Sequence, residues 1–184
     1  MKVLIKDITA ENLSDIPEGC RSYIYWEYPE DFEKIRLVEQ NGKFQFCVEK
    51  KKKWFLETLK EFGNCGQIVY YKDKPVGYAQ YAPFSRLPQA KNHESKNLGK
   101  PDEGVIFLSC LYIPNKSRRG KGVGTQLLKH VINDLKKRGF KAVETFARKG
   151  SSNNPSGPVE LYVKEGFYVG EELSSGYVLV RLDL

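Results

Sequence analysis

Arg118-Arg119-Gly120-Lys121-Gly122-Val123-Gly124 is a glycine-rich, basic run that lies between two strongly patterned segments. Residues 105–113 before it are almost all apolar and β-prone, which is typical of a strand buried on both faces. After it, apolar residues recur at helical spacing as far as Leu135, and Gly139 can end that helix. Glycines allow a backbone to approach a ligand closely, and the unpaired N–H groups at a helix start attract anions. The sequence therefore predicts a phosphate-binding loop between a central strand and a long helix.

Other glycine-rich loops also bind phosphates, and their requirements differ. A P-loop needs Gly-Lys-Ser/Thr where the helix starts, but Lys121 lies inside the run and Thr125 is followed by Gln126, which excludes it. A Rossmann loop needs G-x-G-x-x-G in a tight turn after its strand. The glycines here alternate after a longer connection, although Glu144 falls about where a ribose-binding acid is expected. That interpretation, and a loop that merely caps the helix, remain as alternatives.

A second motif follows the first. Arg119-x-x-Gly122-x-Gly124 resembles the acyl-CoA pyrophosphate loop of the GNAT N-acetyltransferase superfamily, and residues 161–167, Leu-Tyr-Val-Lys-Glu-Gly-Phe, resemble that family's closing Y-x-x-x-G-F segment. The two motifs stand in the family's order, and the resemblance is sharp over residues 104–170. It implies one GNAT-like α/β (α+β) domain over residues 1–184, with a mixed, mostly antiparallel sheet of about six to seven strands flanked by helices.

The resemblance also implies acetyl-CoA as cosubstrate and assigns residues to it. The end of the central strand would hydrogen-bond the pantetheine arm and present a backbone N–H to the thioester oxygen, and the loop would hold the pyrophosphate. The family's Asn before the last helix would fall at Pro155, so the nearest candidate is one residue earlier. The implied set is Leu111, Tyr112, Ile113, Arg118, Arg119, Gly120, Lys121, Gly122, Val123, Gly124, Thr125 and Asn154.

Amide formation from a thioester needs a group for the departing sulfur and an acceptor for the amine proton. By the same resemblance Tyr162 would protonate or hydrogen-bond the sulfur, because a phenol with a pKa of about 10 keeps its proton at neutral pH. The alternative is a tyrosine packed under Phe167 with its hydroxyl in water. Glu103, near the start of the central strand, and Glu27 are the candidate bases, and a surface carboxylate is the alternative for both.

The acceptor side is expected in residues 9–62 and 85–104. Within the first of these, residues 20–28 (Cys-Arg-Ser-Tyr-Ile-Tyr-Trp-Glu-Tyr) gather aromatic side chains that could line a substrate pocket or pack in the core. The long polar segment 85–104 could form a lid on the substrate side or a surface loop without a role in the chemistry. The side chains that could face the same cleft from a neighbouring strand are Tyr78, Gln80 and Tyr81.

The remaining elements follow from periodicity and turn residues. Strands are expected at 3–8, 67–71, 76–81, 141–147, 167–170 and 177–184, with a turn at 72–75, and helices at 31–40, 45–62 and from Pro158 to about Gly166. Four consecutive lysines, residues 50–53, interrupt one helical pattern. Because consecutive helical residues point in different directions, we expect this run to be a solvated surface rather than a nucleic-acid-binding stripe.

Composition limits the function classes. Four cysteines without a C-x-x-C pair and two histidines make no recognisable metal set, and a net charge of +7 leaves room for an anionic partner such as CoA. No signal segment is visible, and nowhere do about 18 apolar residues run together, so we expect a soluble, cytoplasmic protein that binds neither membrane nor nucleic acid. A homodimer is possible.

Together these features predict an enzyme, an N-acetyltransferase that moves an acetyl group from acetyl-CoA to a primary amine by direct attack on the thioester. The acceptor would be a small-molecule or protein amine. The alternative is a non-catalytic CoA-binding sensor or interaction module.

Overall fold

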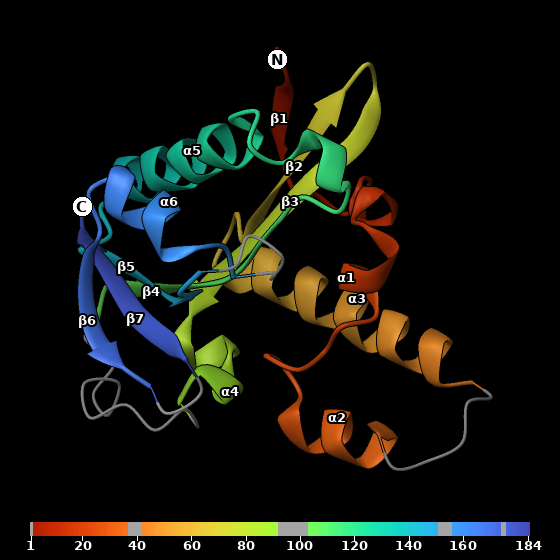
Figure 1. The fold of residues 1–184 in the computed structure, drawn as a ribbon. Coiled ribbons are helices and arrows are strands. Elements are labelled where there is room, and N and C mark those ends of the chain that lie inside the picture. The colour runs from red at the N-terminus through yellow and green to blue at the C-terminus, as the bar shows by residue number, and fades with distance from the viewer. Residues whose placement is uncertain (1, 37–41, 92–102, 151–155, 174–175) are drawn as a thin grey trace.

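The computed structural model describes residues 2–36, 42–91, 103–150, 156–173 and 176–184. One seven-stranded sheet crosses it in the order β1-β2-β3-β4-β5-β7-β6 (Figure 1). The strands are β1 Leu4–Asp7, β2 Gly66–Tyr71, β3 Lys74–Pro83, β4 Val105–Tyr112, β5 Ala142–Arg148, β6 Tyr168–Glu172 and β7 Tyr177–Asp183. The α-helices are α1 Glu18–Arg21, α2 Pro29–Arg36, α3 Lys43–Glu61, α4 Pro88–Lys91, α5 Val123–Lys137 and α6 Val159–Lys164. This is the mixed, mostly antiparallel sheet that the sequence predicted.

The first hairpin shows how local chemistry sets the strands. Lys72 and Asp73 both have positive φ, 49° and 57°, as the two central residues of the tight turns that match the twist of a hairpin do. The expected turn at 72–75 is therefore too long, because β3 already begins at Lys74 and pairs with Tyr71. Pro75 stands near the start of its strand, a position that proline tolerates.

The sheet divides at its centre, between β4 and β5. These parallel strands pair only from Val105–Ala142 to Phe107–Glu144, after which β4 stays with β3 and β5 stays with β7. The register between β3 and β4 shifts between Gln80 and Tyr81, and bulges of this kind bend a strand. The two halves of the sheet therefore separate toward the end of β4, which is where the predicted loop begins.

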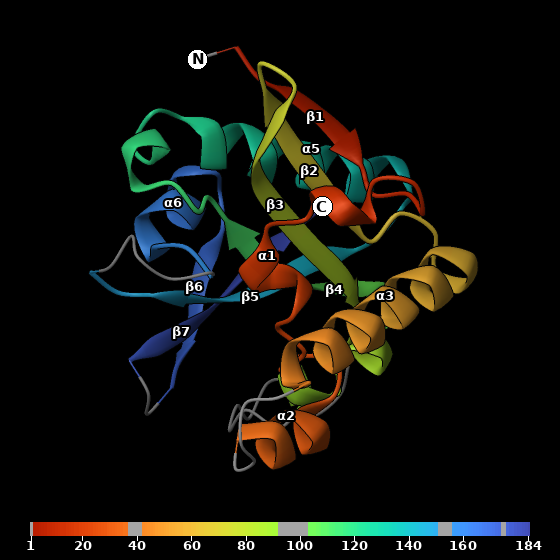
Figure 2. The same cartoon turned by 90° about the vertical axis from the view of Figure 1, so that its right-hand side faces the viewer.

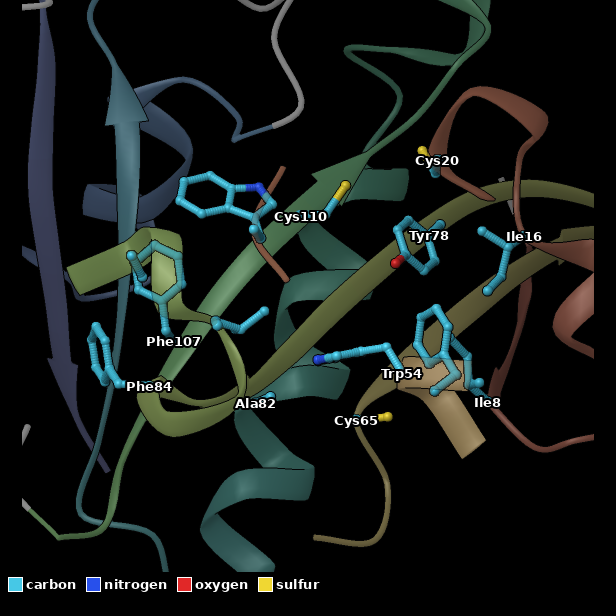
Figure 3. Close-up of a cluster of buried hydrophobic side chains, with 14 of the residues drawn as sticks. Ile8, Ile16, Cys20, Trp54, Cys65, Tyr78, Ala82, Phe84, Phe107 and Cys110 are labelled. Carbon is cyan, nitrogen blue, oxygen red and sulfur yellow. The ribbon is translucent and has the colours of Figure 1, made fainter. Parts of the chain in front are cut away.

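Helices cover both faces of the sheet. The amphipathic helix α5 buries its apolar face, from Val123 to Leu135, against one face, where α6 also lies (Figures 1 and 2). On the other face α3 packs beside the segment that carries α1, around Trp54, Tyr78 and Phe107 (Figure 3). Gly139 has φ 78° just after α5, as expected for the residue that ends this helix.

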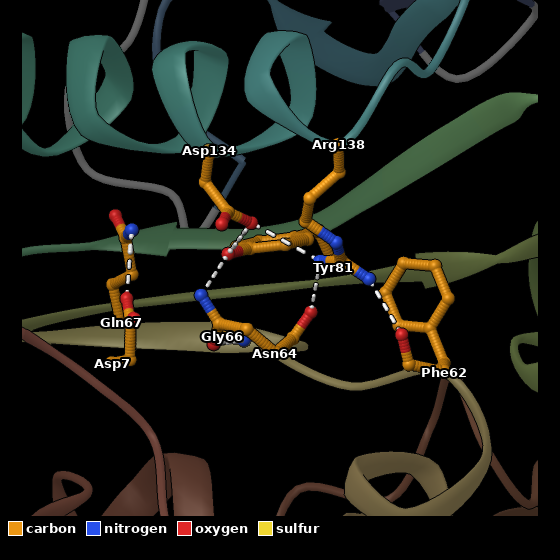
Figure 4. Close-up of polar contacts among 8 residues, drawn as sticks. All are labelled: Asp7, Phe62, Asn64, Gly66, Gln67, Tyr81, Asp134 and Arg138. Carbon is orange, nitrogen blue, oxygen red and sulfur yellow. Dashed lines mark hydrogen bonds and ion pairs between the residues drawn. The ribbon is translucent and has the colours of Figure 1, made fainter.

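A polar network links the C-terminal end of α5 to Tyr81 on β3 and to the segment between α3 and β2 (Figure 4). The Tyr81 hydroxyl donates to Asp134 Oδ2 at 2.8 Å and accepts from Asn64 Nδ2 at 2.8 Å. Arg138 donates to the carbonyl oxygens of Asn64 and Phe62, both at 2.6 Å. Of the strand residues that could have faced the cleft, Tyr81 thus lies on the face of α5, since successive strand residues point to opposite faces.

One further expectation changes in the structure. Residues 84–91 are not the start of a structureless connection but form a 3-10 turn, Phe84–Arg86, and the short helix α4, with Leu87 and Ala90 buried. They are fixed by Trp54, whose Nε1 donates to the Arg86 carbonyl oxygen at 2.8 Å. The rest of the proposed lid, residues 92–102, lies outside the described residues. Within the described part of the chain, no helix is both long and apolar enough to span a bilayer.

Candidate active site

A cavity of about 360 Å³ lies where the sheet divides. Three segments bound it: the end of β4, the loop that leads into α5, and the start of α6, which a bridge between Arg148 and Pro158 holds beside the end of β5. Its lining residues are Leu111, Tyr112, Ile113, Arg119, Gly120, Gly122, Gly124, Thr125, Gly157, Pro158, Leu161 and Lys164. Most of the residues that we expected to bind CoA therefore meet around one cavity.

The first turn of α5 presents at this cavity backbone amides that have no hydrogen-bond partner among the described residues. Gly122, the N-cap, has φ 78° and no side chain caps the helix there. The first helical bond runs from Gln126 N to the Gly122 carbonyl oxygen at 3.0 Å, so the N–H groups of residues 123–125 precede it. Gly120 also has a positive φ, 71°. This backbone suits an anion, because amides and the positive end of the helix dipole point the same way.

The basic side chains of the loop have different roles. Arg119 lines the cavity, but its Nε donates to the Ile113 carbonyl oxygen at 2.8 Å and it lies 5.5 Å from the Tyr112 ring centroid. It therefore fixes the loop to the end of β4. Arg118 lies over the Tyr71 ring at 5.0 Å. Neither Arg118 nor the exposed Lys121 is among the lining residues, and Val123 packs in the core.

One face of α6 lines the cavity and the other enters the core. Leu161 and Lys164, three residues apart, are on the lining face, and sequence reasoning missed them although their spacing was available. Tyr162 is fully buried, packs edge-on against Phe167 with ring centroids 5.2 Å apart, and donates its hydroxyl hydrogen to the Ser156 carbonyl oxygen at 2.5 Å. Of the alternative considered above, the packing against Phe167 is therefore confirmed, whereas the hydroxyl in water is wrong because the side chain is fully buried.

Tyr162 nevertheless lies directly beneath the cavity. A Cβ added to the lining residue Gly157 would be 3.3 Å from the Tyr162 ring and 3.4 Å from its hydroxyl oxygen. Burial raises the pKa of Tyr162 far above its usual value, so the phenol keeps its proton at neutral pH. Pro158, which we expected at the first helical position, is instead the N-cap of α6.

A second cavity, of about 270 Å³, adjoins the first, and Tyr112 lines both. It lies on the α3 side of the sheet. Its lining residues are Gly19, Cys20, Tyr23, Trp26, Lys51, Tyr78, Gln80, Ser109, Cys110 and Tyr112. Three residues of the aromatic segment 20–28, namely Cys20, Tyr23 and Trp26, thus line a pocket, and Trp26 also packs against Phe107, so the structure shows both of the alternatives that the sequence left open.

A buried chain of polar groups lies along this second cavity. Lys51 Nζ donates to Glu27 Oε1 at 2.6 Å and to the Tyr23 carbonyl oxygen at 2.9 Å. Gln80 Nε2 also donates to Glu27 Oε1, and the Tyr78 hydroxyl donates to Gln80 Oε1. Glu27 Oε2 is buried and has no hydrogen-bond partner among the described residues. Such a group is costly unless a ligand or a proton satisfies it.

The position of Lys51 corrects the expectation that residues 50–53 form a solvated surface. Lys52 and Lys53 are exposed, but the Lys51 side chain is 4% exposed because it continues the buried row of Cys47 and Phe55 at four-residue spacing. A basic residue on that row needs an anion, and Glu27 provides it.

Two thiols also face this cavity. Cys20, on α1, and Cys110, on β4, are hydrogen-bonded to each other. The hydrogen bond from Cys110, with a smaller contribution from the charge of Lys51, lowers the pKa of Cys20, whereas the pKa of Cys110 is raised well above the usual value by the same bond and by burial. Cys20 is therefore the more acidic of the two.

Glu103 is not brought to either cavity. It is exposed in the turn before β4, at the opposite end of that strand from Leu111. At roughly 3.3 Å per strand residue, the two ends of β4 are on the order of 25 Å apart. Asn154 lies outside the described residues. Among the described residues, no three of His, Cys, Asp and Glu gather closely enough to hold a metal ion.

Comparisons with known proteins agree with this geometry. The family model described as "Acetyltransferase (GNAT) family" matches residues 21–167, most of the chain. The protein therefore belongs to the GNAT acetyltransferase family. No curated protein matches it in sequence.

Solved structures share the whole fold at low sequence identity. PaiA N-acetyltransferase from Thermoplasma acidophilum, solved in complex with coenzyme A, is 16% identical with a TM-score of 0.60, and the match covers 100% of both chains. An N-acetyltransferase from Staphylococcus aureus Mu50 is 20% identical with a TM-score of 0.61, covering 100% of this chain and 99% of that one. A ribosomal-protein-alanine N-acetyltransferase from Brucella melitensis is 18% identical with a TM-score of 0.59, covering 98% and 99%. Identities this low show the fold alone.

Proposed function

We propose that this protein transfers an acetyl group from acetyl-CoA to a primary amine by direct attack of the amine on the thioester. The observation that carries the proposal is a pair of cavities that meet at Tyr112, one with the first backbone amides of α5 and one with a buried polar chain. A two-substrate reaction needs two such compartments with a shared boundary.

Acetyl-CoA would occupy the first cavity. The pyrophosphate would accept hydrogen bonds from the amides of residues 123–125, and the pantetheine arm would follow the end of β4, from Leu111 to Ile113. This arrangement would bring the thioester to Tyr112. The structure of the Thermoplasma acidophilum relative in complex with coenzyme A supports a CoA site in this fold.

The amine would enter from the second cavity. Its nitrogen attacks the thioester carbonyl carbon, the C–N bond forms, an oxyanion develops near a backbone N–H of β4, and the C–S bond then breaks. The attacking nitrogen must lose a proton, and Glu27, which lies behind the lining residues Lys51 and Gln80, would accept it through a water. Lys51 and Gln80 hold one carboxylate oxygen of Glu27, so the base is fixed in position.

Tyr162 would donate a hydrogen bond to the departing sulfur. Its raised pKa supports the role of donor, and its position beneath Gly157 supports contact with the cavity. Because the hydroxyl donates to the Ser156 carbonyl oxygen, that bond must be exchanged for one to sulfur when CoA binds.

The proposal is tested by following CoA release with a thiol reagent and the acetylated amine by mass spectrometry, over a panel of primary amines. We expect both products in equal amounts, and Tyr162→Phe to lower kcat while it leaves acetyl-CoA affinity nearly unchanged. Equal kcat in the variant would make Tyr162 a packing residue. Binding of acetyl-CoA without transfer to any amine would instead favour a CoA sensor.

A further inference from the structure

The second cavity has walls that select for shape. Four of its lining residues are aromatic: Tyr23, Trp26, Tyr78 and Tyr112. Trp26 is 8% exposed and Tyr78 1% exposed, whereas Tyr23 is 38% exposed and stands at the rim. A ligand that enters the cavity therefore passes the partly exposed ring of Tyr23 and contacts buried aromatic rings inside.

These rings are held in place from behind. The Trp26 ring is 5.3 Å from that of Phe107 and 6.2 Å from that of Phe146. The Tyr78 ring contacts Phe55 at 6.5 Å, and its hydroxyl is bound to Gln80. A rigid aromatic wall loses little conformational freedom when it binds a flat ligand, and offset or edge-on ring pairs gain beyond the area they bury.

The charges of the second cavity disfavour a ligand that carries a second charged group besides its amine. Lys51 is the one formally charged side chain among the described lining residues, and Glu27 lies behind it. Lys51 already donates to Glu27 and to the Tyr23 carbonyl oxygen. A ligand carboxylate would compete with Glu27 for Lys51, and a second ammonium would face Lys51 with no described carboxylate on the wall to balance it.

We infer that the acceptor is an arylalkyl monoamine, that is, a primary amine on a short chain from an aromatic ring, with no second charged group. The inference rests on the proposed function. The ring lies between Trp26 and Tyr112, and the amine points toward the thioester at Tyr112, while Glu27 lies behind the lining residues Lys51 and Gln80. Polyamines, amino acids and lysine side chains of basic peptides are poor ligands of this cavity.

Matched amines test the inference in the protein saturated with CoA. Phenethylamine is compared with 2-cyclohexylethylamine, which lacks the aromatic ring, with phenylalanine, which adds a carboxylate, and with p-xylylenediamine, an aromatic diamine with a second ammonium and one methylene between the ring and each nitrogen. Dissociation constants come from the fluorescence of the two tryptophans and from ligand-observed NMR, and kcat/KM from thiol release. We expect phenethylamine to bind at least about tenfold more tightly than the two amines that carry a second charge, and more tightly than the saturated ring.

A charge placed at the rim of the second cavity should change the order of the affinities for these amines. Tyr23→Glu adds a carboxylate beside the opening, and Tyr23→Gln removes the same ring without the charge. We expect Tyr23→Glu to improve the binding of p-xylylenediamine relative to phenethylamine by about fivefold or more, and Tyr23→Gln to weaken phenethylamine without this gain. Tyr168→Glu, an exposed tyrosine on β6 outside the lining, controls for net charge.

The binding and turnover readouts separate two kinds of failure. If the amines bind in the expected order but none is acetylated, the proposed function is wrong and the ligand class stands. If acetylation occurs and the diamine or phenylalanine is bound or used as well as phenethylamine, the ligand class is wrong and the function stands. An unchanged order in Tyr23→Glu would also overturn the inference, because the charge balance of the cavity would then not decide the ligand.

Discussion

The substitution Lys51→Met should destabilise the protein strongly, because it removes one partner of a buried ion pair. Lys51 Nζ is 2.6 Å from Glu27 Oε1, and the two side chains are 4% and 0% exposed. Without Lys51, the Glu27 carboxylate keeps the amide of Gln80 as a donor and is otherwise buried. Breaking such a pair costs about 3–5 kcal/mol in the free energy of unfolding.

The double variant Glu27→Gln/Lys51→Met should recover much of this loss, because no buried charge then remains unpaired. Urea unfolding of the wild type, both single variants and the double variant gives the coupling free energy. In a protein of this size about 3–5 kcal/mol corresponds to a fall in Tm of roughly 6–20 °C. Lys50→Met is the matched control on the same helix, since Lys50 and its partner Asp31 are 33% and 28% exposed, and should cost less than about 1 kcal/mol.

Two results would refute this reasoning. Additive single losses in the double variant would show that Lys51 and Glu27 stabilise the protein independently. A cost for Lys51→Met no larger than that for Lys50→Met would show that burial of the pair has no energetic consequence. The double variant also separates stability from chemistry, because its fold should recover while acetyl transfer should not.

Two further predictions follow from individual side chains. Cys20 should react with iodoacetamide faster than the other thiols at pH 7–8, because its lowered pKa leaves more thiolate. Its reaction rate should level off with rising pH well before that of Cys65, because burial raises the pKa of Cys65 to about 12. Peptide mass spectrometry of the native protein measures this, and earlier labelling of Cys65 or Cys110 would contradict it. Tyr81→Phe should cost about 1–2 kcal/mol of unfolding free energy, since it removes the hydroxyl that donates to Asp134; chemical denaturation with no change in midpoint would show that the network of Figure 4 does not stabilise α5.

The elements that could be predicted from sequence are those with local signals. The buried strand, the glycine loop and α5 were readable because each has its own pattern: a continuous apolar run, residues that permit positive φ, and a 3.6-residue period. The hairpin of β2 and β3 was readable for the same reason. The mixed sheet of about six to seven strands came only from the resemblance, and the order of the strands was not predicted, since strands far apart in the chain carry no local mark of which neighbour they pair with.

The parts of the site that the backbone forms could be predicted from the sequence. The parts that depend on tertiary contacts could not. The lining of the first cavity by residues 111–113 was implied by the family resemblance, and its lining by Gly120, Gly122 and Gly124 follows from the loop motif. The hydrogen bond from Arg119 to the Ile113 carbonyl oxygen depends on how the loop folds back on the end of β4. The burial of Lys51 beside Glu27 depends on a contact between distant segments. The four-residue spacing of Cys47, Lys51 and Phe55 on one face of α3 could have predicted that Lys51 is buried. Because Lys51 lies in a run of four lysines, we expected it to be solvated instead.

The most direct test of the account is calorimetric titration with acetyl-CoA of the wild type and two glycine variants. Gly122 and Gly139 both have φ 78°, and a Cβ at either position meets nothing within 4 Å, but they lie at opposite ends of α5. Gly122→Glu and Gly139→Glu therefore introduce similar strain and the same charge. We expect wild type and Gly139→Glu to bind alike, and Gly122→Glu to bind at least about tenfold more weakly, because its carboxylate meets the phosphates at the amides. Equal affinity of the two folded variants, or no binding by the wild type, would contradict the placement of CoA at the start of α5.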